Sequence, residues 1–175
     1  MTLEEDVKKC CQEVEGVHRD AERVKRHGND DVRKDLSSFE EKLESFTHDV
    51  REASEKLNRG AREGLQRVVD AWREGRDRLA AHLRLIEAKG FLASARRLAT
   101  EGDFTAARNE LAAAMQDVKE ATELMPGKDA HLAALNAEIE RAVAEIQAAG
   151  KAATSTIEQA VAHSARLLEE LKQAS

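Results

Sequence analysis

Aromatic residues are scarce in this chain: they make up 3 % of its 175 residues, and tyrosine is absent. A deep pocket lined by aromatic side chains, the kind in which many enzymes hold a substrate, is therefore not expected. The chain also has a single proline, whereas 35 % of its residues are charged. Such a composition is typical of long, solvated helices and predicts an all-α protein.

Other absences narrow the function classes. No run of 18 apolar residues occurs, and no basic segment followed by an apolar run opens the chain, so we expect a cytoplasmic protein without a signal peptide. The net charge is -6 and basic residues do not cluster, so nucleic acid is not expected as a partner. Neither a nucleophile elbow nor a phosphate-binding loop is present. We therefore predict no enzymatic activity, no catalytic residue and no cofactor.

The first half of the chain carries apolar residues in alternating steps of four and three. One such ladder runs from Leu3 to Val24 and stops at "RHGNDD". There Gly28 is expected in the left-handed conformation that ends a helix, and Asn29 or Asp30 is expected to cap the next one. A second ladder runs from Val32 to Leu57. Two ladders joined by a short turn predict an antiparallel coiled-coil hairpin.

The stretch "LNRGAREGL" at residues 57–65 places Gly60 and Gly64 directly after the second ladder. The apolar stripe continues beyond them through Leu65 and Val68, with the eleven-residue spacing that keeps a stripe on one face of a helix. No Ser, Thr or Asp follows Gly60 to begin a new helix. We therefore predict one continuous helix from Asp31 to about Lys89. A hinge at the two glycines is the alternative.

The second half is rich in alanine. A helix end at Gly102 is followed by a cap at Asp103, and a second stop, "MPGKD", offers Asp129 as a cap. Apolar residues then continue from Leu132 to Leu171 across Gly150, where no capping signal appears, so the helix is expected to run through. The predicted fold is all-α, an elongated antiparallel coiled-coil hairpin (residues 1–78) that continues into an Ala-rich helical bundle (residues 79–175).

Residues 92–126 resemble a single, elongated tetratricopeptide (TPR) helical hairpin. The resemblance rests on the turn and second helix, that is, on Gly102, Asp103, Phe104, Ala107, Leu111 and Ala114. A proline follows the second helix in that family about two turns sooner than Pro126 does here. Because one hairpin lacks the concave groove of stacked repeats, the resemblance implies protein–protein interaction in general and assigns no binding residues.

Two histidines have a glutamate at helical spacing. Glu15 and His18 form one "ExxH" pair, but a di-iron bundle needs a second pair and none of the other histidines supplies it. Glu44, His48 and Glu52 lie in a row beside basic residues, which favours surface ion pairing. The adjacent Cys10 and Cys11 cannot bridge each other on a helix, and we expect reduced thiols with Cys10 the more protected. No metal site is assigned.

The largest apolar side chains of the long helix suggest an interface. Val, Ala and Cys dominate the apolar stripe of the first helix, and these side chains are too small to cover Phe39, Phe46 and Trp72. A second copy of the chain would bury these three side chains, so we predict a homodimer. The candidate partner interface consists of Leu36, Phe39, Leu43, Phe46, Val50, Leu65, Val68 and Trp72.

The sequence favours a non-catalytic structural or adaptor protein that acts through helical self-association and contacts with other proteins. A second class is an amphipathic coat of a lipid or storage-granule surface, since all-helical, aromatic-poor phasins and exchangeable apolipoproteins are similar in composition. A third is a metal-binding helical bundle. These classes differ in their partners: the chain itself or another protein, a membrane or granule surface, or a metal ion.

Overall fold

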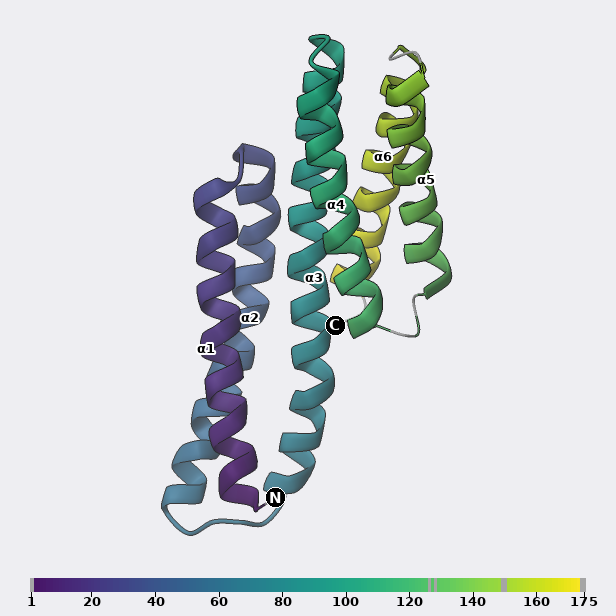
Figure 1. The fold of residues 1–175 in the computed structure, drawn as a ribbon. Coiled ribbons are helices and arrows are strands. Elements are labelled where there is room, and N and C mark those ends of the chain that lie inside the picture. Colours follow the sequence, from purple (N-terminus) through teal and green to yellow (C-terminus); the bar gives the residue numbers. More distant parts are fainter. Residues whose placement is uncertain (1, 126, 128, 149–150, 174–175) are drawn as a thin grey trace.

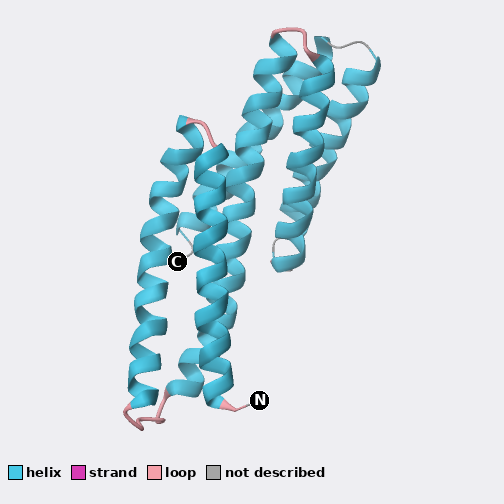
Figure 2. Cartoon of the chain, turned by 60° about the vertical axis from the view of Figure 1, so that its left-hand side comes forward, coloured by secondary structure: helices cyan, strands magenta, loops and turns pink. Residues whose placement is uncertain are grey.

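The computed structural model describes residues 2–125, 127, 129–148 and 151–173. Within these ranges the chain forms six helices and no strand (Figures 1 and 2). The all-α prediction is confirmed. The helices are α1 (Leu3–His27), α2 (Asp30–Asn58), α3 (Leu65–Thr100), α4 (Phe104–Leu124), α5 (Asp129–Ala148) and α6 (Lys151–Gln173).

The ends of α1 and α2 follow the capping residues. The Thr2 hydroxyl accepts from the Glu5 amide while the Glu5 carboxylate accepts from the Thr2 amide, a capping box that satisfies two amides at the start of α1. The Asn29 side chain accepts from the Val32 amide and caps α2, as predicted. The expectation for Gly28 is wrong, since its φ is -85°. Asn29 thus starts the second helix without a left-handed residue before it.

The chain turns at Gly60 and Gly64, so the predicted continuous helix from Asp31 to Lys89 is wrong. Gly60 has φ 84° and Gly64 has φ 77°, a left-handed conformation that costs other residues free energy. The Gly60 amide donates to the Leu57 carbonyl and the Ala61 amide to the Lys56 carbonyl, which is the Schellman pattern of a helix end. The apolar stripe persists through the turn because α2 and α3 bury it against each other.

The turn brings α3 back along α1 and α2, and the three helices form the lower part of the molecule in Figure 1. Their shared core is small. Trp72 fills its centre and its ring is tilted against Phe46, with the ring centroids 6.4 Å apart. This lower core consists of Val7, Cys10, Val14, Val50, Ala53, Leu65, Val69 and Trp72. The antiparallel hairpin of α1 and α2 is therefore one part of a three-helix bundle.

In the upper part of the molecule α3 packs against α4 and α6, and α5 packs against α4 and α6 in turn (Figure 1). Gly102 has φ 86° and the Asp103 side chain caps α4 through the Ala106 amide, as predicted. The larger core takes buried residues from all six helices, among them Phe39 of α2 and Ile86 of α3. The boundary predicted between residues 78 and 79 lies inside α3, which belongs to both cores.

The predicted helix across Gly150 is also wrong. The chain forms two helices there, and α5 and α6 lie side by side (Figure 1). An alanine-rich stripe can pack against a neighbouring helix as well as continue along one, so the pattern did not separate the two arrangements. Gly150, Pro126 and the side chain of Asp129 lie outside the residues that the structure describes.

Replacing either turn glycine with alanine should destabilise the protein by about 1 kcal/mol, because the new Cβ must adopt the left-handed conformation. No heavy atom lies within 4 Å of a Cβ built at Gly60 or Gly64, so crowding does not confound the result. Gly16 is the matched control: it lies inside α1 with equally open space, and Gly16→Ala should stabilise by up to about 1 kcal/mol. Urea unfolding of the three variants measures these signs. A gain in stability at Gly60 and Gly64 would contradict the turn.

Candidate functional site

The predicted partner interface lies mainly inside the chain. Leu36, Phe39, Leu43, Val50, Leu65 and Trp72 are each less than 5 % exposed, because α3 folds back over the stripe that the first helix was expected to leave uncovered. Phe46 and Val68 are half-buried. As a free surface the predicted interface is therefore wrong. Self-association stays a prediction and no longer rests on an uncovered stripe.

Phe46 lines a cleft where the two bundles meet. This cleft has a volume of ≈ 880 Å³ and opens between α2 and α3, below the ends of α4 and α6. We call it the His82 cleft. Its lining residues are Lys42, Ser45, Phe46 and Asp49 of α2; Glu74, Gly75, Asp77, Arg78, Leu79 and His82 of α3; and Leu124, Met125, Gly127 and Leu171.

The floor of the His82 cleft depends on Gly75. A Cβ at this position would lie 2.9 Å from Cε2 of Phe46, closer than side chains approach one another. The missing side chain therefore lets the Phe46 ring lie against α3, where it reaches Trp72. Leu79, Met125 and Leu171 extend this apolar floor toward the upper bundle.

His82 closes the upper end of the cleft. The side chain is 3 % exposed, and its ring meets Phe39 edge to face with a centroid distance of 5.4 Å. Burial, together with the positive charges of Lys42 and Lys172, lowers its pKa to about 4, so the imidazole is neutral near pH 7. Its Nε2 finds no hydrogen-bond partner in the part of the chain that the structure describes. A buried polar atom left in this way is unusual in a folded protein.

Charged side chains surround the cleft unevenly. Lys42 Nζ donates to the carbonyls of Leu171 (3.1 Å) and Lys172 (3.3 Å), tying α2 to the last turn of α6. Asp77 is paired with Arg76 at 3.0 Å. The remaining charges of the rim, Asp49, Glu74 and Arg78, form no ion pair or side-chain hydrogen bond with any described residue.

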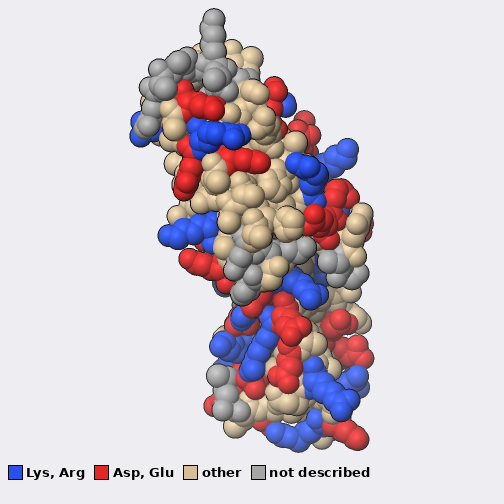
Figure 3. Space-filling view, turned by 90° about the vertical axis from the view of Figure 1, so that its right-hand side faces the viewer, with Lys and Arg blue, Asp and Glu red and all other residues tan. Residues whose placement is uncertain are grey.

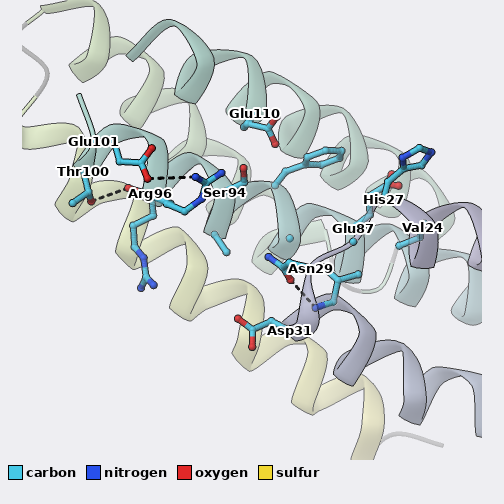
Figure 4. Close-up of a pocket in the computed structure, with 16 residues that line it drawn as sticks. Val24, His27, Asn29, Asp31, Glu87, Ser94, Arg96, Thr100, Glu101 and Glu110 are labelled. Atoms are coloured by element: carbon cyan, nitrogen blue, oxygen red, sulfur yellow. Dashed lines mark hydrogen bonds and ion pairs between the residues drawn. The ribbon is translucent and has the colours of Figure 1, made fainter. Parts of the chain in front are cut away.

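A second cleft lies at the upper end of α1 and α2, beside the half-buried Phe91 (Figure 4). Several of its polar groups already have partners within the protein. Asn29 caps α2, Thr100 Oγ1 donates to the Arg96 carbonyl, and Arg97 pairs with Glu101 at 3.4 Å. The cleft has a volume of ≈ 720 Å³ and is lined by Val24, His27, Gly28, Asn29, Asp31, Val32, Glu87, Gly90, Phe91, Ala93, Ser94, Arg96, Arg97, Thr100, Glu101 and Glu110. It is the weaker candidate for binding.

Arg84 joins α1, α3 and α4 through a largely buried ion cluster. Its guanidinium pairs with Asp20 of α1, with Glu87 at 3.3 Å and with Asp117 of α4 at 3.7 Å. Asp117 Oδ2 has no partner among the described residues. Burial, the hydrogen bond with Glu87 and the repulsion between the two carboxylates raise the pKa of Asp117 above its ordinary value. Near pH 7 the pair therefore retains a proton.

The predicted histidine pairs have structural partners. His18 Nε2 lies 2.8 Å from the Thr47 hydroxyl, which links α1 to α2. His48 and Lys56 both lie beside Glu52, at 3.8 and 3.3 Å, so surface ion pairing is confirmed there. No group of three metal-ligating side chains gathers among the residues that were described. Within the same residues, no helix is long and apolar enough to cross a membrane.

Both cysteines are free and belong to α1. Cys10 is buried in the lower core and Cys11 is half-buried, which agrees with the expected order of protection. Burial raises the pKa of the Cys10 thiol to about 11 and also raises the pKa of Cys11. Neither thiol is activated as a nucleophile, since reactive cysteines have a lowered pKa.

The sequence interpretation missed His82, Gly75, Arg84 and Asp117. The signal for His82 and Arg84 was present in "LAAHLRLI", where two basic residues interrupt an otherwise apolar run. Such residues must be satisfied by partners or face a cavity, and both outcomes occur here. Gly75 had only its place in the apolar ladder as a signal. Nothing local marked Asp117, whose environment comes from Arg84 and Glu87 of α3.

No protein-family model, curated protein or solved structure matches the chain. The TPR-like hairpin proposed for residues 92–126 stays a prediction. What the site can do follows from its own geometry: an apolar floor, an unsatisfied imidazole and unpaired charges on the rim, all at the junction of two bundles.

Asp117→Asn should stabilise the protein increasingly as the pH rises. The folded Asp117 holds its proton at a pH where the unfolded carboxyl has lost it, so the unfolding free energy of the native protein falls as pH rises through the folded pKa. Asparagine cannot ionise, and its amide can still bond Glu87. The difference in unfolding free energy between variant and native protein, measured by urea titration from about pH 5 to about pH 9, should grow with pH.

Glu120→Gln is the control, because Glu120 lies 3.8 Å from Arg84 on the same helix but is more exposed. It removes a charge beside Arg84, and because Glu120 is the last of the causes that raise the pKa of Asp117, it should leave most of the pH slope of the native protein in place. Equal slopes for Asp117→Asn and the native protein would show that Asp117 is ionised in the fold.

Proposed function

We propose that this protein is a non-catalytic adaptor that binds a partner protein in the His82 cleft. The observation that carries the proposal is the cleft itself, in which several groups have no partner among the described residues. A large apolar floor around Phe46 is open to solvent, and the buried Nε2 of His82 lacks a hydrogen bond among the described residues. Concave apolar surfaces with a few polar groups are where proteins bind their partners and ligands.

The helices that form the cleft walls are held in place by the rest of the fold. Both walls are long helices, and α3 is buried in two cores, so the walls are held from outside the cleft. Lys42 fixes the upper end of the cleft by its bonds to the last turn of α6. A preformed site loses less conformational entropy on binding than a flexible one, which favours affinity.

The surface charge also suits a protein partner. Figure 3, which shows the right-hand side of Figure 1, has Lys and Arg interspersed with Asp and Glu over the lower part and a broad area without charged side chains over the upper bundle. Exposed alanines of α5, among them Ala133, Ala137 and Ala144, belong to the upper bundle. Interspersed charges give no continuous basic stripe of the kind that binds nucleic acid.

Blocking the cleft should abolish partner binding. Ser45 lies exposed at the rim on α2, and Ser45→Trp would place an indole over the Phe46 floor. Ser37→Trp is the matched control, since Ser37 is also exposed on α2 but lines neither cleft. We expect proteins captured from the host lysate by the native chain and by Ser37→Trp to be lost with Ser45→Trp, as measured by quantitative mass spectrometry.

The two variants should unfold at similar temperatures, which separates blocking from misfolding. Equal capture by all three proteins would contradict the proposal. Sedimentation of the native chain as a dimer that Ser45→Trp dissociates would identify a second copy as the partner. Binding to phospholipid vesicles without any cleft-dependent protein partner would instead favour the lipid-coat function.

A further inference from the structure

We infer that the occupant of the His82 cleft is an amphipathic α-helix that lies between α2 and α3, in line with α6. The inference rests on the proposed function and names the kind of partner segment that the cleft accepts. It follows from the packing around α3, from the spacing of the lining residues and from the charges on the rim.

The upper half of α3 is covered by more helices than the lower half. In the upper bundle α3 packs against α4 and α6, whereas its lower half packs, among the described residues, against α1 and α2. Helix α6 descends beside α3 and stops level with the middle of α2, where its last carbonyls meet Lys42 (Figures 1 and 2). The cleft begins at this end of α6. A helix placed there would extend the line of α6 and complete a four-helix arrangement below it.

The lining residues have the spacing of helix faces. Lys42, Phe46 and Asp49 follow one another at steps of four and three along α2, and Gly75, Leu79 and His82 do so along α3. Each wall therefore presents one side of a helix over about two turns. Ridges and grooves of this kind accept the ridges of a third helix. An extended strand gains no backbone partners here, because the amides and carbonyls of both walls bond within their own helices.

Small and adaptable side chains line the place where the helix would approach. Ser45 has a short side chain, so a helix backbone can come close to α2 there, while Gly75 lets the Phe46 ring lie against α3 as part of the floor. Met125 lies half-buried at the upper end, and methionine adapts its shape to different apolar partners. Phe46 is the central apolar contact, since it is only half-buried between these two walls.

The rim charges set the polarity of the occupant. On α2, Asp49 lies about one turn further from α6 than Phe46 does, and on α3, Glu74 lies one turn further from α6 than Arg78. Neither Asp49 nor Glu74 has a partner among the described residues. Arg78 is likewise unpaired at the end nearer α6. The matching helix therefore carries basic residues beside Asp49 and Glu74 and an acidic residue about one turn along. A polar side chain at its upper end can give His82 the hydrogen bond that it lacks.

The test is a selection of displayed random peptides of ~16 residues, about four helical turns, against the full-length protein. Binders are then made as free peptides and measured by titration with the native chain, Ser45→Trp and Ser37→Trp. We expect apolar residues at steps of three and four, a rise in helical circular dichroism on binding, and affinity at least about tenfold weaker for Ser45→Trp alone. The double variant Asp49→Lys/Glu74→Lys should weaken binding of peptides with basic flanks.

The outcomes separate the inference from the proposed function. Peptides that depend on the cleft but bind without helical spacing and without a gain in helicity would overturn the helical occupant and leave the binding function standing. Peptides unaffected by Ser45→Trp, or the absence of any binder, would overturn both. Helical binders whose affinity is unchanged by Asp49→Lys/Glu74→Lys would overturn the inferred charge pattern.

Discussion

Helix α3 has to bury its surface in two bundles at once, and this constraint shapes the whole molecule. Around its middle, Ala81, His82, Leu83, Leu85 and Ile86 are nearly all consecutive in sequence and all buried, so the helix is enclosed on every side there. Helices α1 and α2 cover it from one side, and α4 and α6 from the other. Because a fully enclosed helix cannot place its polar residues in water, His82 and Arg84 must find other environments.

Arg84 and His82 lie in different environments, and this difference explains why a cleft is open beside His82. Arg84 is surrounded by carboxylates of α1, α3 and α4, which cross-link the helices around it. His82 remains neutral at the opposite junction, where α4 and α6 end and leave the α2–α3 groove open below them. One junction is thus closed by charge and the other is left unfilled. The proposed adaptor function uses the unfilled one.

Much of the fold could be predicted from the sequence, because caps and stripes are local signals. Asn29 and Asp103 start helices where predicted, and the all-α class follows from composition and spacing. The turn at Gly60 and Gly64 could not be predicted, since an apolar stripe is the same whether a helix continues or folds back on its neighbour. The same ambiguity hid the break between α5 and α6. The site depends on which helices meet around His82, and that is decided by the turn.

The distance between the two walls of the cleft tests this account most directly. Spin labels carried by non-canonical residues at Asp49 and Glu74, both exposed on the rim, leave Cys10 and Cys11 in place. Since packed helices lie 8–10 Å apart, electron–electron resonance should give a label separation below about 20 Å. A single helix through Gly60 and Gly64 would place the two positions ~38 Å apart, at 1.5 Å per residue. A distance near that value would contradict the turn, the shared helix and the cleft together.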